Sequence, residues 1–226
     1  MTRQPELVFD PGLDRDAIRA ALVFAEGLET TRRDAPGAAL AGLLEKVRGF
    51  GESWLSEARK KAVRDMLRYG NYKPAGRAKP SSEYLLASAL DGSFPFVNGP
   101  VDANNAASLE YGYPASIFDR ATSGDRLLLK RGGTDNSYVF NKSGQVISLA
   151  DLLCVWRETD GGRSEAIGNP VKDATVTKVF EGCTSIVAVV YAPGGQEGRD
   201  LEACAERFAA LLREDCGAAF AGWVLA

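Results

Sequence analysis

Residues Lys79 to Asp119 read KPSSEYLLASALDGSFPFVNGPVDANNAASLEYGYPASIFD, and no other part of the chain says as much about fold and function. A proline and two adjacent serines open the segment, VDANN stands in its middle, and YPASIFD closes it. A packed core does not need polar residues and turn formers at this density. We therefore expect the binding site of the protein in this segment.

The same segment predicts two helices followed by a strand. Ser81 or Ser82 is expected to cap a helix that ends at Asp91-Gly92. A short helix is expected after Pro100, and the pattern changes to β from Ser116 onward.

Before this segment, breakers and periodicity indicate strands and then helices. Glu6 to Asp10 predicts a short strand that ends in a turn. IRAALVFAE, Ile18 to Glu26, is compatible with helix or buried strand, and we favour strand. From Ala38 to Tyr69 apolar residues recur at helical spacing with an interruption near Gly49 and Gly51, which indicates two consecutive helices.

After the segment the pattern is mostly β. SIFD, RLLLKR, SYVF and LLCVWRE are short candidate strands, and the Gly132-Gly133 and Gly161-Gly162 pairs are expected to be hairpin turns. CTSIVAVVY, Cys183 to Tyr191, indicates a buried strand. An amphipathic helix from Glu197 to Asp215 follows, and a last strand is expected from Trp223 to Leu225.

Together these elements predict one α+β domain over residues 1–226, with a central, mostly antiparallel sheet flanked by helices. Residues 1–60 form its N-terminal strand and helical part, and residues 197–226 its C-terminal helix and edge.

Composition suits a globular protein. The chain has 226 residues, 45% of them apolar and 25% charged, which is enough to bury a large core. No apolar run is long enough to span a membrane, and the N-terminus lacks the apolar centre of a signal peptide. The four widely spaced cysteines are expected to be reduced and buried rather than disulfide-bonded or metal-bound. We expect a cytoplasmic protein.

The chain contains no histidine. That excludes Ser-His and Cys-His nucleophile pairs and imidazole bases, and it leaves no conventional zinc ligand set. We expect no metal and no cofactor. Any catalysis must use carboxylates, hydroxyls, amides, Lys or Arg.

Positive charge is concentrated between Arg59 and Lys79, although the net charge is −3. Eight Lys and Arg residues face the single acid Asp65 in this run. One interpretation is a solvated helix face followed by a basic loop. The other is a phosphate-facing patch that leads into the polar segment.

The polar residues also admit two readings. Ser81 and Ser82 can be simple helix caps, and a helix start with free N–H groups can also hold an anion. Asp102, Asn104 and Asn105 can form an Asx turn or line a pocket. Ser116 is a nucleophile only if a base activates it, and the sequence offers none nearby. Arg157 is expected near a strand end, paired to an acid.

The order KPSSEYLL, VDANNAASLEYGYPASIFD, GDRLLLKRGG, VWRE and TSIVAVV resembles the B3/B4 domain of the β chain of bacterial phenylalanyl-tRNA synthetase, which also occurs as free-standing proteins. The resemblance covers roughly Arg64 to Tyr191. The synthetase segment reads approximately VDVTNYVMLELGQPLHAFD. The matching positions here are Val101, Asp102, Asn105, Leu109, Glu110, Gly112, Pro114, Phe118 and Asp119. Pro80, Ser81, Glu83, Leu85 and Leu86 match the RPSxExLL start of the free-standing proteins.

This resemblance implies an editing domain that hydrolyses a wrongly attached amino acid from tRNA. The synthetase histidine falls on Ser116, its threonine on Asn104, and its late acidic residue near Ala188, so the tyrosine-reading groups are changed. The implied catalytic residues are Asn104, Asn105 and Ser116. The implied substrate-binding residues are Lys79, Ser81, Ser82, Glu83, Asp102, Pro114 and Arg157. The expected tRNA-binding residues are Arg59, Lys60, Arg64, Arg68, Lys73 and Arg77.

Two functions follow as hypotheses. In the first, the protein is a trans-editing hydrolase that cleaves the ester of a mischarged aminoacyl-tRNA. In the second, it is a non-catalytic module that binds an amino-acid-like ligand or the tRNA end.

Overall fold

The computed structural model describes residues 4–159 and 161–226. These residues form two four-stranded sheets, a small two-stranded sheet and a set of helices, so the predicted mixed α+β fold is confirmed. The strands are β1 (Glu6–Phe9), β2 (Ile18–Glu26), β3 (Ala115–Asp119), β4 (Arg126–Arg131), β5 (Ser137–Val139), β6 (Val146–Ser148), β7 (Leu153–Thr159), β8 (Arg163–Gly168), β9 (Ser185–Pro193) and β10 (Phe220–Leu225). The α-helices are α1 (Ala38–Phe50), α2 (Glu57–Leu67), α3 (Ser81–Asp91), α4 (Gly99–Tyr111), α5 (Arg120–Ser123) and α6 (Leu201–Cys216).

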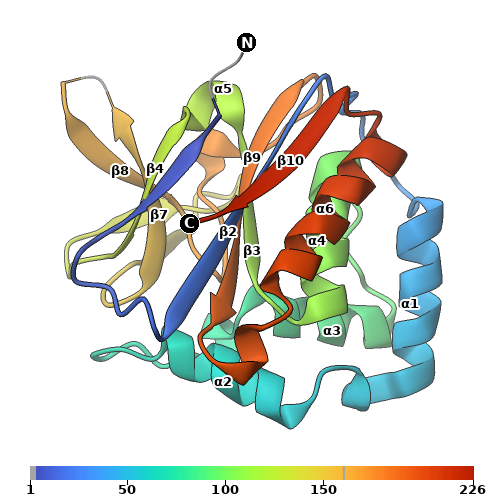
Figure 1. The fold of residues 1–226 in the computed structure, drawn as a ribbon, viewed down its shortest axis with the longest axis horizontal. Helices are drawn as coiled ribbons and strands as arrows, with labels where there is room; N and C mark the ends of the chain where they lie inside the picture. Colours follow the sequence, from blue (N-terminus) through green and yellow to red (C-terminus); the bar gives the residue numbers. More distant parts are fainter. Residues whose placement is uncertain (1–3, 160) are drawn as a thin grey trace.

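The strands are mostly antiparallel, as predicted. One sheet has the order β10-β2-β9-β3 with every pair antiparallel. The other has the order β1-β4-β7-β8, in which only the β1–β4 pair is parallel. Figure 1 shows the sheet that contains β2 and β9 between the second sheet and the helices α4 and α6.

This sandwiched position explains the sequence of β2. Six consecutive residues of the strand, Ala20 to Ala25, are buried. Helix α6 covers one face of the sheet, and residues of the second sheet, including Leu127 and Val155, belong to the same core cluster. A strand buried on both faces has no polar alternation, which is why IRAALVFAE could also have been a helix.

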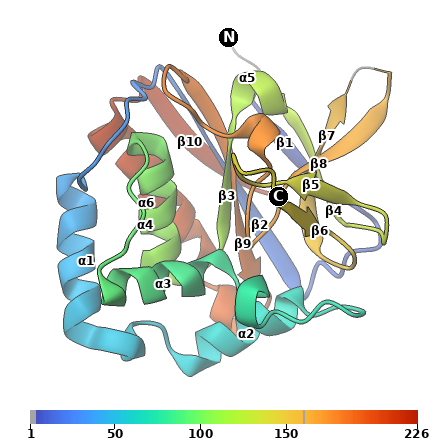
Figure 2. The same ribbon diagram turned by 180° about the vertical axis from the view of Figure 1, so that it is seen from behind.

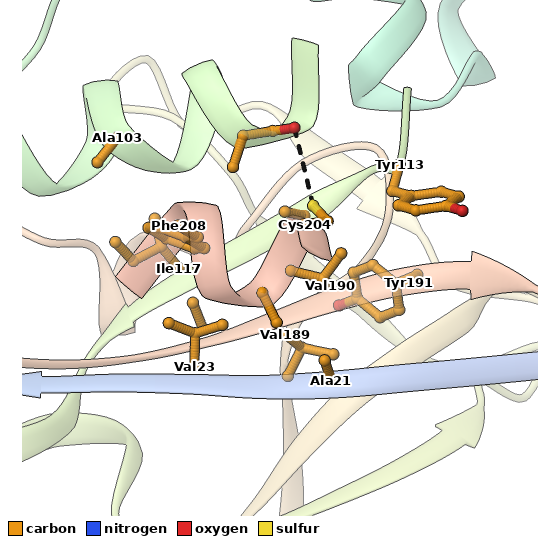
Figure 3. Packing of buried hydrophobic residues seen from close by; sticks show 14 of the residues in the cluster. Ala21, Val23, Ala103, Tyr113, Ile117, Val189, Val190, Tyr191, Cys204 and Phe208 are labelled. Atoms are coloured by element: carbon orange, nitrogen blue, oxygen red, sulfur yellow. Dashed lines mark hydrogen bonds between the residues drawn. The ribbon is translucent and has the colours of Figure 1, made fainter. Parts of the chain in front are cut away.

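The core between α6 and the sheet is closely packed. Figure 3 shows Phe208 and Cys204 of α6 above side chains of β2 and β9, among them Val23 and Val189. The Cys204 thiol donates to the Ala107 carbonyl of α4 at 3.8 Å. All four cysteines are free and buried, as the sequence predicted.

Most other sequence expectations are also confirmed. The interrupted helical pattern is α1 and α2, with a single 3-10 turn, Gly51–Trp54, between them. Gly161 and Gly162, both at positive φ, turn β7 into β8. Gly132 is not part of a hairpin, because β4 pairs with β7 and Gly132 instead bridges to Ala150.

Within the described residues, no helix has the length and apolar character that crossing a membrane requires.

Candidate functional site

The polar segment folds as α3, α4 and β3. Asn98 caps α4 by accepting the Val101 N–H at 3.1 Å, and Pro100 occupies the first turn. Gly112, at φ 74°, ends the helix in the left-handed conformation. The Ser108 hydroxyl then donates to the Tyr113 carbonyl at 2.7 Å, which fixes the bend that leads into β3.

The start of α3 differs from the prediction. Pro80, not Ser81 or Ser82, occupies the N-cap position, and no side chain caps this helix. Proline sets the extended backbone before the helix, so both serines fall inside it. The Ser81 N–H donates to the Pro170 carbonyl at 2.8 Å, and Ser82 is buried. The first turn of α3 is therefore held against residue 170, which no sequence signal indicated.

Ser116 lies in the interior with its hydroxyl fully engaged. It is 0% exposed, donates to the Asn169 carbonyl at 3.2 Å and accepts from the Tyr191 hydroxyl at 2.9 Å. The neighbouring Pro114 is also buried, and its carbonyl accepts the Tyr191 N–H at 3.0 Å. The consecutive residues Asn169 and Pro170 thus link the two serines, since the carbonyl of Asn169 accepts from Ser116 and that of Pro170 accepts from Ser81.

An acid faces the same strand. Asp173 Oδ2 accepts the Ile117 N–H at 3.1 Å, while its buried Oδ1 has no partner. Gly168 makes room for it, because a Cβ there would be 2.6 Å from Oδ1 and 2.5 Å from the Phe118 ring. Burial raises the pKa of Asp173 to about 7, although the Ser116 hydroxyl and the Ile117 N–H favour the charged form. A group of this pKa can exchange a proton at neutral pH.

Asp102, Asn104 and Asn105 lie inside α4 rather than in an Asx turn. Asp102 Oδ1 accepts the Val97 N–H at 3.0 Å, and burial raises its pKa to about 6. It lines a cavity of about 10 Å³ together with Arg33 and Asp215. That volume suits one water molecule and not a substrate. Asp102 therefore faces a different environment from Ser81 and Ser116.

The two asparagines contact each other. Asn104 Nδ2 donates to Asn105 Oδ1 at 3.3 Å, while Asn104 Oδ1 is buried without a partner. Asn105 is half-buried. Both lie on the helix that packs against α3 and β3.

Six buried side-chain oxygens in the described residues have no hydrogen-bond partner. They belong to Thr30, Ser81, Asp102, Asn104, Asp173 and Thr177. Such groups are rare in native proteins, and each requires an explanation such as water, a ligand or a catalytic role. Three of the six belong to residues that the sequence selected, and a fourth, Asp173, contacts Ser116.

Most side chains of the expected tRNA-binding set are paired with acids. Arg59 bonds to Glu197 at 3.0 Å and Asp200 at 2.8 Å, and lies over the Tyr113 ring. The other pairs are Lys60 with Glu57, Arg64 with Glu83, and Arg68 with Asp65. Lys73, Arg77 and Lys79 are exposed, and none of them has an ion-pair partner within residues 4–159 and 161–226.

Two expected substrate-binding side chains are also committed to ion pairs. The Glu83 carboxylate accepts hydrogen bonds from both Nε and Nη2 of Arg64. Arg157 bonds to Glu165 at 2.7 Å, as expected for an arginine paired to an acid near a strand end. The structure thus groups Ser81 and Ser116 around residues 169–173, with Pro114 next to Ser116. It leaves Arg157 in the second sheet.

An open cleft of about 560 Å³ lies elsewhere, between the β1–β2 loop, α2 and the turn after β9. Of the residues expected at a site it contains only Arg68. Among the described residues, no three His, Cys, Asp or Glu side chains are grouped so that they could hold a metal ion.

Sequence reasoning missed Asn169, Asp173 and Tyr191. They lie more than fifty residues after Ser116, or on the strand paired with β3, so only the fold brings them to it. The NPVKD segment reads as an ordinary loop, and without structure nothing marks its acid as buried.

Comparison with family models found no match, and comparison with curated proteins found no relative. Among solved structures, the chain is similar to an N-terminal fragment of the phenylalanyl-tRNA synthetase β-subunit from Pyrococcus horikoshii, with a TM-score of 0.50 and 8% sequence identity. The match covers 100% of this chain and 56% of that one, so the chain spans about half the length of this neighbour. At this identity the likeness shows the fold alone.

Proposed function

We propose that this protein acts on tRNA and hydrolyses the ester bond of a mischarged aminoacyl-tRNA. Two things support the proposal. The fold is shared with a fragment of a tRNA synthetase subunit. The main support is that Ser81, Asn104 and Asp173 each have a buried side-chain oxygen without a hydrogen-bond partner. These residues lie on or beside the elements formed by the Lys79–Asp119 segment. Polar atoms of this kind suit a polar ligand that carries its own donors.

In this proposal Asp173 supplies the base that a chain without histidine otherwise lacks. Its carboxylate takes a proton from a water molecule as the water oxygen bonds to the ester carbonyl carbon. The bond from that carbon to the ribose oxygen then breaks, and the ribose oxygen takes up the proton, which leaves a free amino acid and deacylated tRNA. A pKa near 7 suits both proton transfers at neutral pH. Amide groups of Asn104 and Asn105 would stabilise the developing oxyanion.

A second function, binding without chemistry, is favoured by the environment of Ser116. Its hydroxyl is fully buried and has both a donor and an acceptor, so it is poorly placed to attack a substrate. A module that holds an amino acid or the tRNA end would need only the polar groups and no proton transfer.

The test is release of amino acid from a panel of mischarged tRNAs by the wild type, Asp173→Asn and a control variant of an exposed acid, Asp135→Asn. We expect release for at least one pair, a loss of about tenfold or more in kcat for Asp173→Asn, and no loss for the control. Release that never exceeds buffer hydrolysis would contradict the hydrolase. In that case a rise in melting temperature with free amino acids would support the binding module.

A further inference from the structure

The cations between Arg59 and Lys79 fall into two groups, those paired with a carboxylate and those without an ion-pair partner among the described residues. Lys60 and Lys61 on α2 and Arg68 at its C-cap each have a carboxylate within ion-pair distance. In the loop between α2 and α3, Lys73, Arg77 and Lys79 have none among the described residues and are exposed. Paired surface charges contribute little to an external field, whereas free ones attract anions. Within the run from Arg59 to Lys79, the loop and not the helix therefore offers free positive charge to an anion.

A second group of lysines lies far away in the sequence. Lys142 is exposed at the tip of the β5–β6 hairpin, and Lys172 is exposed with its ammonium 4.0 Å from the centre of the Phe140 ring. Lys178 donates to the Phe140 carbonyl at 2.5 Å. Burial lowers the pKa of Lys178, the charge of Asp173 opposes that shift, and the charge of Lys142 adds to it.

Hydrogen bonds join the two groups. Lys79 is two residues from Ser81, whose N–H binds the Pro170 carbonyl, and Lys172 is two residues beyond Pro170. The Tyr138 hydroxyl of the hairpin donates to the Lys172 carbonyl at 2.5 Å. Tyr72 of the loop packs in the same apolar cluster as Tyr138. Figure 2 shows the loop after α2 projecting on the same side of the molecule as β5 and β6.

An exposed aromatic residue lies five positions after Lys79 in the sequence. Tyr84, in the first turn of α3, is 60% exposed, and its N–H lies 3.3 Å from the Pro80 carbonyl, next in sequence to Lys79. Cations interleaved with an exposed aromatic ring are typical of surfaces that bind single-stranded nucleic acid, where phosphates meet the charges and a base stacks on the ring. An acidic protein segment would use the charges but would not need the ring.

We propose that Lys73, Arg77, Lys79, Tyr84, Lys142 and Lys172 form a surface, here called the loop–hairpin surface, that binds single-stranded RNA such as the 3′ end of a tRNA. This inference rests on the proposed function, because it identifies where the RNA of that reaction is held. Asp151, which accepts the Asn71 N–H at 2.8 Å, is the acid next to the loop and reduces its charge only in part.

The experiment measures binding of a labelled deacylated tRNA by fluorescence anisotropy between 50 and 200 mM salt. The test variant is Lys73→Ala/Arg77→Ala/Lys79→Ala. The matched control, Lys60→Ala/Lys61→Ala/Arg68→Ala, removes the same charge from the neighbouring helix. The slope of log K against log salt falls by roughly 0.7 for each single-strand phosphate contact that is lost. We therefore expect the test variant, which removes three cations, to lower this slope by about 2. We expect the control to change it by well under 1.

Two further comparisons test the single-stranded partner. Tyr84→Ala should weaken binding by about tenfold, whereas Phe220→Ala, which removes another exposed aromatic ring, should not. A tRNA lacking its single-stranded 3′ end should bind wild type more weakly than the intact tRNA. Equal effects of the test and control triple variants, or equal binding of the shortened tRNA, would overturn the inference. Tighter binding to anionic lipid vesicles than to tRNA would also overturn it.

The outcomes separate this inference from the proposed function. Salt-dependent binding through the loop–hairpin surface without amino-acid release would support the surface and contradict the hydrolase. Release with KM and kcat unchanged in the loop variant would support the hydrolase and contradict the surface.

Discussion

The sharpest prediction concerns the dependence of stability on pH. Burial raises the pKa of Asp173 to about 7 in the folded protein, compared with an ordinary value of 3.8. The folded state therefore holds a proton that the unfolded state has lost, and stability falls as pH rises from about 4 to about 7. A difference of roughly 3 pKa units corresponds to about 4 kcal/mol at 1.4 kcal/mol per unit, which is an upper bound. Asp102, with a pKa of about 6, adds a smaller loss in the same direction.

The chain suits this measurement because it has no histidine, the residue that ordinarily dominates titration between pH 5 and 8. Urea unfolding of wild type and Asp173→Asn at pH 4.5 and pH 8 would measure the effect. The asparagine keeps an oxygen for the Ile117 N–H but cannot ionise. We expect Asp173→Asn to unfold at a higher urea concentration than wild type at pH 8. Between pH 4.5 and pH 8 its free energy of unfolding should fall by several kcal/mol less than that of wild type. The exposed Asp135→Asn serves as control. If the free energy of unfolding depends on pH in the same way for wild type and Asp173→Asn, the reasoning is refuted.

Three further predictions concern packing and pairing. Glu83, 8% exposed, accepts two bonds from Arg64, which is 37% exposed; Glu83→Gln should cost about 1–2 kcal/mol in urea unfolding at pH 7, and a change near zero would contradict a structural ion pair. In Gly168→Ala, the new Cβ would approach Phe118 and Asp173 within 2.6 Å; we expect a cost of about 1–3 kcal/mol and a Tm lower by roughly 3–10 °C, and an unchanged Tm would show that the site has room. Burial raises the pKa of every cysteine thiol. A thiol reagent at pH 8 should therefore react only slowly with the native protein, whereas in urea it should react readily with all four thiols. Rapid reaction of the native protein would contradict the buried positions.

Local sequence was enough for most elements, because their signals are local. Pro100 in the first turn of α4 and Gly112 at its end act through backbone conformation, which depends on neighbours a few residues away. The division of the strands into two sheets was not predictable in the same way. β1 pairs with β4 in parallel across more than a hundred residues, and nothing in ELVF or RLLLKR specifies that partner. Long-range pairing is decided by packing of the whole core, so periodicity cannot supply it.

The candidate site shows the same limit more severely. The motif placed α4 and β3 next to each other, but the chemistry around Ser116 comes from Asn169, Asp173 and Tyr191. An aspartate in a polar loop ordinarily ionises below pH 5 and says nothing about catalysis. Its pKa rises towards 7 only because the fold encloses it against β3, and that enclosure depends on Gly168 having no side chain. Because the chain has no histidine, any proton transfer falls to other groups, and the enclosed Asp173 carboxyl group is the candidate. Asp173 tests both the fold and the proposed function, because the same substitution should stabilise the protein at high pH and, if the proposed hydrolysis is right, lower kcat by about tenfold or more.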